Sequence, residues 1–385
     1  MVYHPQLRNI ARQRCEEGGT ITMPIIDADT HVDETEDTWA YLDAGDQQFK
    51  PETAYPKDQD PSRPPMRYWV IDGKRHLRFI RSDEQTQTTV QTRELIDVDA
   101  RLRDMDRMGV DVQVMYPTLS LVEVTERPEV ALALRHSYNR WLADRWARSG
   151  GRLRWVMLPP LRTMDKALEE LRFAKGHGAC GLLKKGDREA GFWPADPYFF
   201  PLYEEAQRLD LPICFHTGSG TPDFSPARQF QFGGFYRITL PVVHAFQSLI
   251  LQGVPAQFPT LRFGFIEAAA SWIPHVVHNL RRHLAKNRER PASVLRGTNK
   301  FLDISEDVMR SNHMYVTCEV DEDLSYLLKY IGEDNLLLGS DYSHSDPAQE
   351  MSFIRRLQQR ADAGDIPQSV VKKITDHNPR AFYGL

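Results

Sequence analysis

The order of apolar runs along the chain constrains the fold more than any other feature. Eight short runs of aliphatic and aromatic residues alternate with stretches of helical periodicity, such as Val98, Leu102, Met105 and Met108, which Gly109 ends. Strands that alternate with helices predict a parallel sheet, and eight of them predict a closed (β/α)₈ TIM-type barrel of the α/β class. The strands are expected at residues 24–29, 112–118, 153–161, 180–183, 212–216, 261–267, 314–320 and 335–341.

An open, doubly wound sheet is the alternative fold, because it uses the same alternation of elements. Residues 33–96 fit neither pattern: the segment is too long for one strand–helix step and is rich in Pro, Asp and Arg. Within it, Asp72 and Gly73 separate two strand-like runs and predict a hairpin. We interpret residues 1–385 as a single barrel domain in which 33–96 is an insertion that serves as a lid.

Charge and composition exclude several classes of partner. The net charge of −5 gives no basic surface for nucleic acid, and no apolar run reaches the roughly 18 residues of a membrane span. The N-terminal segment lacks the apolar core of a signal peptide. The cysteines Cys15, Cys180, Cys214 and Cys318 are far apart, as expected of unpaired thiols in a reducing compartment. A cytoplasmic protein is therefore expected.

Acidic and histidine side chains stand where the apolar strands end. Asp29 and His31 are two residues apart on the first strand and so point the same way. His216, Glu267 and Asp341 end the fifth, sixth and eighth strands. In a barrel these ends meet at one face, where catalysis takes place. This set of ligands suits one or two divalent ions, Zn, Fe or Mn, which would make hydroxide available near neutral pH.

The motifs IDADTHV, FHTG, GSDYSH and HNPRAFYGL together give the chain a family resemblance. It resembles the amidohydrolase-related branch of the amidohydrolase superfamily, which includes aminocarboxymuconate-semialdehyde decarboxylase and resorcylate decarboxylases. The resemblance implies that Asp29, His31, His216 and Asp341 are the metal ligands. Relatives carry His or Glu where this chain has Asp29. Since relatives commonly form dimers, a homodimer is expected.

The sixth strand departs from the decarboxylase pattern. Decarboxylases of this family carry a histidine there that handles a proton, whereas this chain reads RFGFIEAAASWIP, with Glu267. A carboxylate at this place can activate water. We therefore expect a hydrolase that cleaves an ester or thioester, with a decarboxylase, a C–C bond hydrolase and a non-catalytic binding protein as alternatives. Lys184 or Lys185 would bridge a second ion if carboxylated, as the resemblance implies.

Other polar residues are candidates for proton transfer and substrate binding. Asp341 and Glu267 are the expected bases, and His344 and His244 the expected proton donors to the leaving group. The hairpin carries six basic residues, of which Arg75 and Arg78 are candidates for holding an anionic small molecule, such as a carboxylate or an acyl-CoA phosphate. Tyr236 and Arg237 form a second candidate substrate contact.

Overall fold

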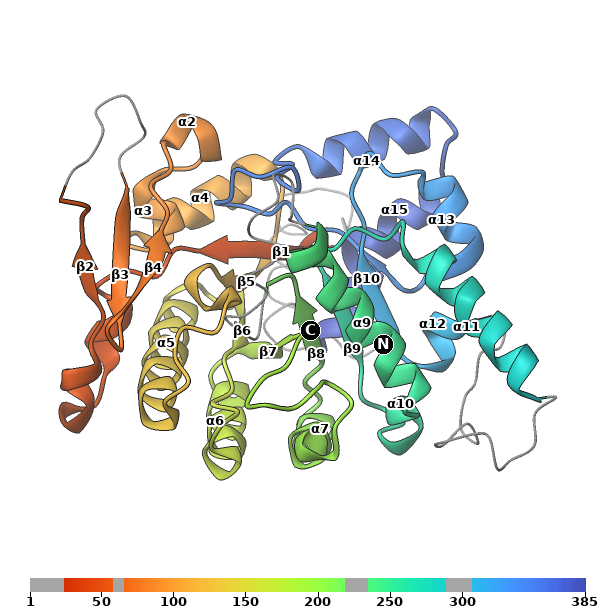
Figure 1. The fold of residues 1–385 in the computed structure, drawn as a ribbon. Coiled ribbons are helices and arrows are strands. Elements are labelled where there is room, and N and C mark those ends of the chain that lie inside the picture. Colours follow the sequence, from red (N-terminus) through yellow and green to blue (C-terminus); the bar gives the residue numbers. More distant parts are fainter. Residues whose placement is uncertain (1–23, 58–65, 219–234, 289–306) are drawn as a thin grey trace.

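The computed structural model describes residues 24–57, 66–218, 235–288 and 307–385, and its centre is a parallel eight-stranded sheet (Figure 1). The strands follow one another around the sheet in chain order, β1-β5-β6-β7-β8-β9-β10-β11. All eight predicted strands are confirmed, and the sequential order rules out the doubly wound alternative, whose strand order reverses. Their bounds are β1 Ile26–Val32, β5 Val112–Pro117, β6 Leu153–Met157, β7 Ala179–Lys185, β8 Ile213–His216, β9 Phe263–Ile266, β10 Met314–Thr317 and β11 Leu336–Leu337.

Backbone hydrogen bonds between β1 and the chain that follows β11 close the barrel. The Ala28 amide donates to the Leu338 carbonyl over 3.1 Å, and the Asp341 amide donates to the Asp29 carbonyl over 3.0 Å. The first and last strands are therefore neighbours, although more than 300 residues separate them in sequence. This junction carries two of the predicted metal ligands.

Helices surround the barrel (Figure 1), and their buried apolar residues belong to the same hydrophobic core as those of the strands. In α4, Asp97 caps the start by accepting from the Ala100 amide, and Gly109 ends the helix with a φ of 73°. The longer helices are α4 Val98–Met108, α5 Pro128–Arg148, α6 Met164–Gly176, α7 Phe200–Arg208, α9 Leu240–Leu251, α11 Ile273–Arg288, α13 Leu324–Ile331 and α14 Phe353–Asp362. Shorter helical segments are η1 Thr38–Tyr41, η2 Ala44–Phe49, α2 Asp83–Thr86, α3 Val90–Arg93, η3 Leu119–Leu121, η4 Pro197–Phe199, η5 Phe235–Thr239, α10 Val254–Gln257, α12 Val308–Ser311, α15 Gln368–Lys372, η7 Lys373–His377 and α16 Asn378–Tyr383.

A three-stranded antiparallel sheet lies between β1 and α4 in the sequence and at one side of the barrel (Figure 1). It consists of β2 Glu52–Ala54, β3 Arg67–Ile71 and β4 Lys74–Arg78. The predicted hairpin is confirmed: Asp72 and Gly73 connect β3 to β4 with φ values of 50° and 74°, the positive angles that a type I′ turn requires. The sequence did not predict β2. The buried Trp69 packs with Trp39 in a small core of their own.

The C-terminal helix α16 packs against the barrel strands. The Tyr383 hydroxyl donates to the Ala28 carbonyl over 2.6 Å, and a methyl group at Gly264 would lie 2.2 Å from the Phe382 ring. Cys180, Cys214 and Cys318 are buried free thiols, while Cys15 falls outside the described residues. Among the helices that the structure describes, none combines the length and apolar character needed to cross a membrane.

Candidate metal centre

The five predicted ligands converge at the carboxyl ends of four strands. Asp29 and His31 belong to β1, His216 is the last residue of β8, Glu267 follows β9 directly, and Asp341 lies after β11. Four of the five side chains are at most 5% exposed, and Glu267 is 12% exposed. Active sites of parallel barrels lie at this end, because the loops there are not needed to hold the barrel together.

The donor atoms are close enough to share one ion. Nε2 of His31 lies 3.5 Å from Asp29 Oδ1, 3.5 Å from Glu267 Oε2 and 3.5 Å from Asp341 Oδ1. Nε2 of His216 lies 3.5 Å from Asp29 Oδ1 and 3.1 Å from Glu267 Oε2. Metal–ligand bonds of about 2.0–2.2 Å would place neighbouring ligand atoms at roughly these separations.

The same atoms make no hydrogen bond within the described residues, although Asp341 Oδ1 lies 2.8 Å from His344 Nδ1. Asp29 Oδ1, His31 Nε2, His216 Nε2, Glu267 Oε2 and Asp341 Oδ1 are buried and have no hydrogen-bond partner. Buried polar atoms without partners are costly, and several that face one point indicate a missing ligand. Nitrogen and carboxylate oxygen suit Mn, Fe or Zn, so the residues fit a divalent metal ion.

The ring of each histidine is oriented by a hydrogen bond from its Nδ1, so that its Nε2 lies among the carboxylates. Nδ1 of His31 donates to the Pro117 carbonyl over 2.8 Å, and Nδ1 of His216 donates to the Thr217 carbonyl over 3.0 Å. A carbonyl oxygen only accepts, so Nδ1 carries a proton and Nε2 is the nitrogen that faces the carboxylates and is available to a metal ion. Such contacts fix the tautomer and ring orientation of histidines that bind metals.

Burial and mutual repulsion perturb the carboxyl groups. Burial is the main reason why the pKa of Asp29 and that of Asp341 are raised, and it raises the pKa of Glu267 to about 8. Burial alone would lower the pKa of His216, but the Glu267 and Asp29 carboxylates outweigh it and raise the value to about 9. A cation at the centre would relieve this crowding of negative charge.

Two of the ligands sit on strained backbone. Glu267 has a φ of 55° and Asp341 a φ of 49°, in the left-handed region that non-glycine residues rarely occupy. Such strain concentrates at functional sites and persists where surrounding contacts enforce it. Here it turns each side chain inward immediately after its strand ends.

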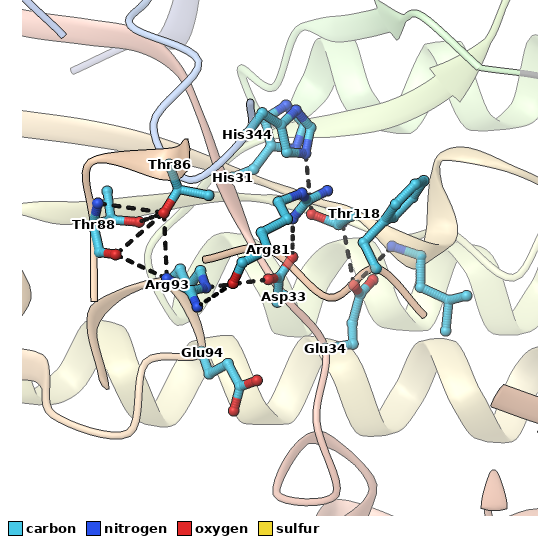
Figure 2. Close-up of polar contacts among 12 residues, drawn as sticks. His31, Asp33, Glu34, Arg81, Thr86, Thr88, Arg93, Glu94, Thr118 and His344 are labelled. Atoms are coloured by element: carbon cyan, nitrogen blue, oxygen red, sulfur yellow. Dashed lines mark hydrogen bonds and ion pairs between the residues drawn. The ribbon is translucent and has the colours of Figure 1, made fainter. Parts of the chain in front are cut away.

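His344, which the sequence analysis named as a candidate proton donor, extends the centre toward β5. Its Nδ1 lies 2.8 Å from Asp341 Oδ1, its ring stacks on His31 at 3.7 Å, and its Nε2 lies 3.2 Å from the Thr118 hydroxyl. Figure 2 shows His344 stacked on His31 and joined to Thr118. His344 therefore connects the candidate metal ligands with the carboxyl end of β5.

The insertion contributes Arg81, which the sequence analysis did not place in the site. Its Nη1 forms a 2.7 Å ion pair with Asp33, directly after β1, and Arg93 lies on the other side of Asp33 at 3.9 Å. Figure 2 shows Arg81 beside His31 and His344, and its charge contributes to lowering the pKa of both, although burial is the larger cause. The basic residues of the hairpin indicated that this segment could hold an anion. Their spacing in the sequence does not determine which arginine lies near the metal centre.

The remaining residues predicted for substrate binding or proton transfer are not placed at the metal centre. Arg75 is exposed and its guanidinium lies over Tyr68, while Arg78 is buried and pairs with Glu36 through two nitrogens, at 2.5 and 2.9 Å. His244 is exposed, and its ring lies 4.7 Å from that of Trp193. The structure brings none of these three to the metal ligands. Tyr236 and Arg237 lie in η5, and their side chains fall outside the described residues.

The lysines at the end of β7 are paired with an acid. Lys184 Nζ lies 3.0 Å from Glu189 Oε2, and Lys185 Nζ lies 3.5 Å from Glu189 Oε1; all three side chains are buried. Among the described residues, two groups could hold a metal ion: Asp29, His31, His216 and Glu267, and His31, Glu267, Asp341 and His344. They share His31 and Glu267, so they describe one continuous centre.

A parallel barrel with histidines and carboxylates converging at its carboxyl face defines a metal-binding enzyme class. The sequence profile of the amidohydrolase family matches residues 26–385, so the chain belongs to this family, as the resemblance predicted.

Two known proteins with related sequences are decarboxylases. The chain is 23% identical over 247 residues to 2-amino-3-carboxymuconate-6-semialdehyde decarboxylase of Dictyostelium discoideum, covering 64% of this chain and 66% of that protein. It is 27% identical over 138 residues to gamma-resorcylate decarboxylase of Rhizobium radiobacter, covering 34% and 42%. The matches therefore span less than two thirds of these relatives.

Solved structures share the fold over nearly the whole chain. An amidohydrolase of Mycobacterium avium subsp. paratuberculosis has a TM-score of 0.71 and 19% identity, and the match covers 95% of this chain and all of that one. The 5-carboxyvanillate decarboxylase of Novosphingobium aromaticivorans, complexed with manganese and 4-hydroxy-3-methoxy-5-nitrobenzoic acid, has a TM-score of 0.64 and 18% identity, covering 94% and 96%.

Proposed function

We propose that this protein is a metal-dependent, non-oxidative decarboxylase of a small aromatic or unsaturated carboxylic acid. The observation that carries the proposal is His344, a buried histidine whose Nδ1 lies 2.8 Å from Asp341. It supplies at the centre the proton-handling histidine that the sixth strand lacks. The decarboxylase activities of the sequence relatives support this reaction over the hydrolysis that we expected from the sequence.

The candidate ligands would hold a divalent ion through Asp29, His31, His216 and Asp341. When bound, the ion supplies positive charge that attracts and orients an anionic substrate. Arg81 adds a second positive charge on the insertion side, where Figure 2 shows it beside His31 and His344. Because guanidinium binds carboxylate through two parallel hydrogen bonds, Arg81 is our candidate for orienting the substrate, in place of Arg75 and Arg78.

Decarboxylation needs a proton at the carbon that carries the carboxylate. Burial lowers the pKa of His344 in the free protein, and the negative charge of a bound substrate carboxylate would favour its protonated form. In the proposed reaction this imidazolium delivers its proton to the carbon and becomes neutral, the bond to the carboxylate breaks, and its electron pair returns to the ring or double bond as CO₂ leaves. The contact with Thr118 holds the imidazole, and Asp341 lies on its other nitrogen. Positioned acid–base catalysis of this kind contributes roughly 10²–10⁴-fold to a rate.

The test uses the manganese-loaded protein with a panel of hydroxybenzoates and, separately, ester and thioester substrates. We expect CO₂ release from the acids and, in D₂O, one deuterium at the carbon that lost the carboxylate. His344→Asn should lower the decarboxylation rate about 10²-fold or more, while His244→Asn, the matched control, should not. Release of alcohol or thiol from the esters, with no CO₂ from any acid, would overturn the proposal.

Hydrolysis is the second candidate, and Glu267 is the observation that favours it. Its Oε2 lies 3.1 Å from His216 Nε2, within the group of candidate ligands, where a carboxylate can take a proton from an attacking water. An ester, a thioester or a C–C bond next to a carbonyl would be cleaved by the same attack. The substrate panel above separates these reactions by their products.

A further inference from the structure

Asp27 precedes the metal ligand Asp29 by two residues but faces away from the metal centre. In the pairing of β1 with β5, Asp27 lies opposite Gln113 and Thr30 lies opposite Met115, so β1 advances by three residues where β5 advances by two. This bulge breaks the alternation of side chains, which would otherwise place Asp27 on the side of Asp29.

Asp27 instead binds the residue before Asp341. Its Oδ1 accepts from the Ser340 amide over 2.8 Å, and its Oδ2 accepts from the Ser340 hydroxyl over 2.6 Å. Gln113 Nε2 donates to the same Oδ2 over 3.4 Å. Asp27 and Ser340 are both completely buried, so water does not compete for these bonds.

The backbone that Asp27 holds is the one that turns Asp341 inward. Asp341 has its positive φ directly after Ser340, and its amide donates to the Asp29 carbonyl over 3.0 Å. Gly339 lies so close to β1 that a methyl group there would be 2.4 Å from Asp29 Cβ. The strained turn is thus pinned to β1 on either side of the Ser340–Asp341 peptide.

The buried hydrogen bonds around Asp27 extend to His31, the other candidate metal ligand on β1. Arg101 of α4 donates from Nε to Gln113 Oε1 over 2.8 Å and from Nη1 to the His31 carbonyl over 3.0 Å. Its guanidinium lies 3.9 Å from the ring of Tyr342, the residue after Asp341. Hydrogen bonds thus connect the backbone of His31 through Arg101, Gln113 and Asp27 to Ser340.

We propose that Asp27 is a positioning residue, which acts through Ser340 to hold the Asp341 carboxylate in its metal-binding orientation. The inference rests on the proposed metal site but not on the reaction, because it concerns metal affinity. Residues behind metal ligands typically change affinity by about 10–100-fold when they are replaced.

The test measures Mn²⁺ affinity by calorimetry in the full chain. Asp27→Asn, which keeps the side-chain size, and Ser340→Ala, which removes the hydroxyl, should each weaken Mn²⁺ binding by about 10-fold or more. The decisive comparison is a double-mutant cycle: in an Asp341→Ala background, Asp27→Asn should weaken Mn²⁺ binding no further, because the ligand that Asp27 positions is gone.

Asn335→Ala is the matched control for lost stability. Asn335 is buried beside the opposite end of β11, where it donates to the Met314 carbonyl over 2.8 Å. The Asn335→Ala substitution should lower the melting temperature and leave Mn²⁺ affinity unchanged. The proposal is overturned if Asp27→Asn and Ser340→Ala bind Mn²⁺ like the wild type, or if Asp27→Asn is additive with Asp341→Ala. If Asp27→Asn does not fold, Ser340→Ala takes its place. The Mn²⁺ affinity of Ser340→Ala and its additivity with Asp341→Ala then test the proposal in the same way.

Discussion

Glu267 is the residue at which the two candidate reactions differ. From the sequence, it could instead have stabilised the start of the following helix. In the structure α11 begins at Ile273, and the amides of Ala270 and Ser271 before it donate to Glu322. Glu267 itself contributes an unpaired buried oxygen to the metal centre. Its position therefore favours a role at the centre, as a ligand or as a base.

Replacing Glu267 with Gln keeps the size of the side chain but removes its charge. If Glu267 is a base or a ligand, kcat should fall about 10²-fold or more, with a small change in melting temperature. Turnover of the best substrate and thermal unfolding should be measured on the same Mn²⁺-loaded samples. A normal kcat with unchanged metal content would remove Glu267 from the chemistry and, with it, the main argument for hydrolysis.

Glu189 makes stability depend on pH. Burial would raise its pKa, but the charges of Lys184 and Lys185 outweigh burial and lower the value from 4.5 to about 2. A pKa lowered on folding stabilises the protein above pH 4.5 by about 3 kcal/mol, and this is lost as the pH falls toward 2. Glu189→Gln should therefore be destabilised at pH 7, by about 3–5 kcal/mol, with a smaller difference from wild type at pH 3.

Urea unfolding at both pH values measures this difference. Glu169→Gln is the matched control, because Glu169 pairs with Lys166 on the exposed surface, where ion pairs contribute little. If the difference in free energy of unfolding between the wild type and Glu189→Gln is the same at pH 7 and pH 3, the pKa of Glu189 is not lowered in the folded state.

Among the elements, the junction of β1 with the chain after β11 determines the geometry of the centre. β11 has only two residues, after which Gly339 passes close to Asp29 and the chain turns inward at Asp341. The close approach is possible because glycine has no side chain. The turn that follows the short last strand thus carries a candidate ligand.

A methyl group at Gly339 should separate the two strands. It would meet Asp29 at three atoms within 2.8 Å, two of them backbone, so Gly339→Ala must shift β1 or the Asp341 turn. We expect Mn²⁺ affinity to fall by 10-fold or more, together with a lower melting temperature, since a 1 Å displacement misaligns the ligands. Gly176→Ala, at the end of α6 with nothing within 4 Å, is the control and should retain both. Wild-type Mn²⁺ affinity in Gly339→Ala would contradict the tight junction.

On the scale of the whole molecule, we expect the barrel to fold without the metal. Its core consists of apolar side chains between strands and helices, and the ligands occupy one end. Removing metal with a chelator should therefore leave the circular dichroism of the folded barrel. The melting temperature should fall, because an ion at 100 times its Kd stabilises the native state by about 2.7 kcal/mol. His216→Ala should show no such dependence on Mn²⁺; full metal occupancy in this variant would refute its assignment as a ligand.

The expected homodimer is also a property of the whole molecule. The sheet of the insertion and the residues that follow it expose apolar side chains, including Leu77, Phe79 and Ile80, which a second copy could cover. Light scattering at micromolar concentration should give twice the mass of the 385-residue chain. A monomeric mass would refute the prediction.

The sequence by itself determined the barrel and the candidate ligands. Apolar runs in parallel barrels are continuous because both faces of the sheet are buried, so all eight strands could be found. Polar residues that end such runs must meet at one face, which is why Asp29, His31, His216, Glu267 and Asp341 could be named together. The hairpin could be predicted because its turn depends on two adjacent residues.

The tertiary structure decided what depends on contacts between distant segments. Arg81, rather than Arg75 or Arg78, faces the centre, because Glu36 takes up the charge of Arg78 and the chain returns to β1 only after the hairpin. Asp27 faces Ser340 because a bulge in β1 breaks the alternation of its side chains. Neither direction follows from spacing along the chain, since each is set by residues that come close only when the barrel closes.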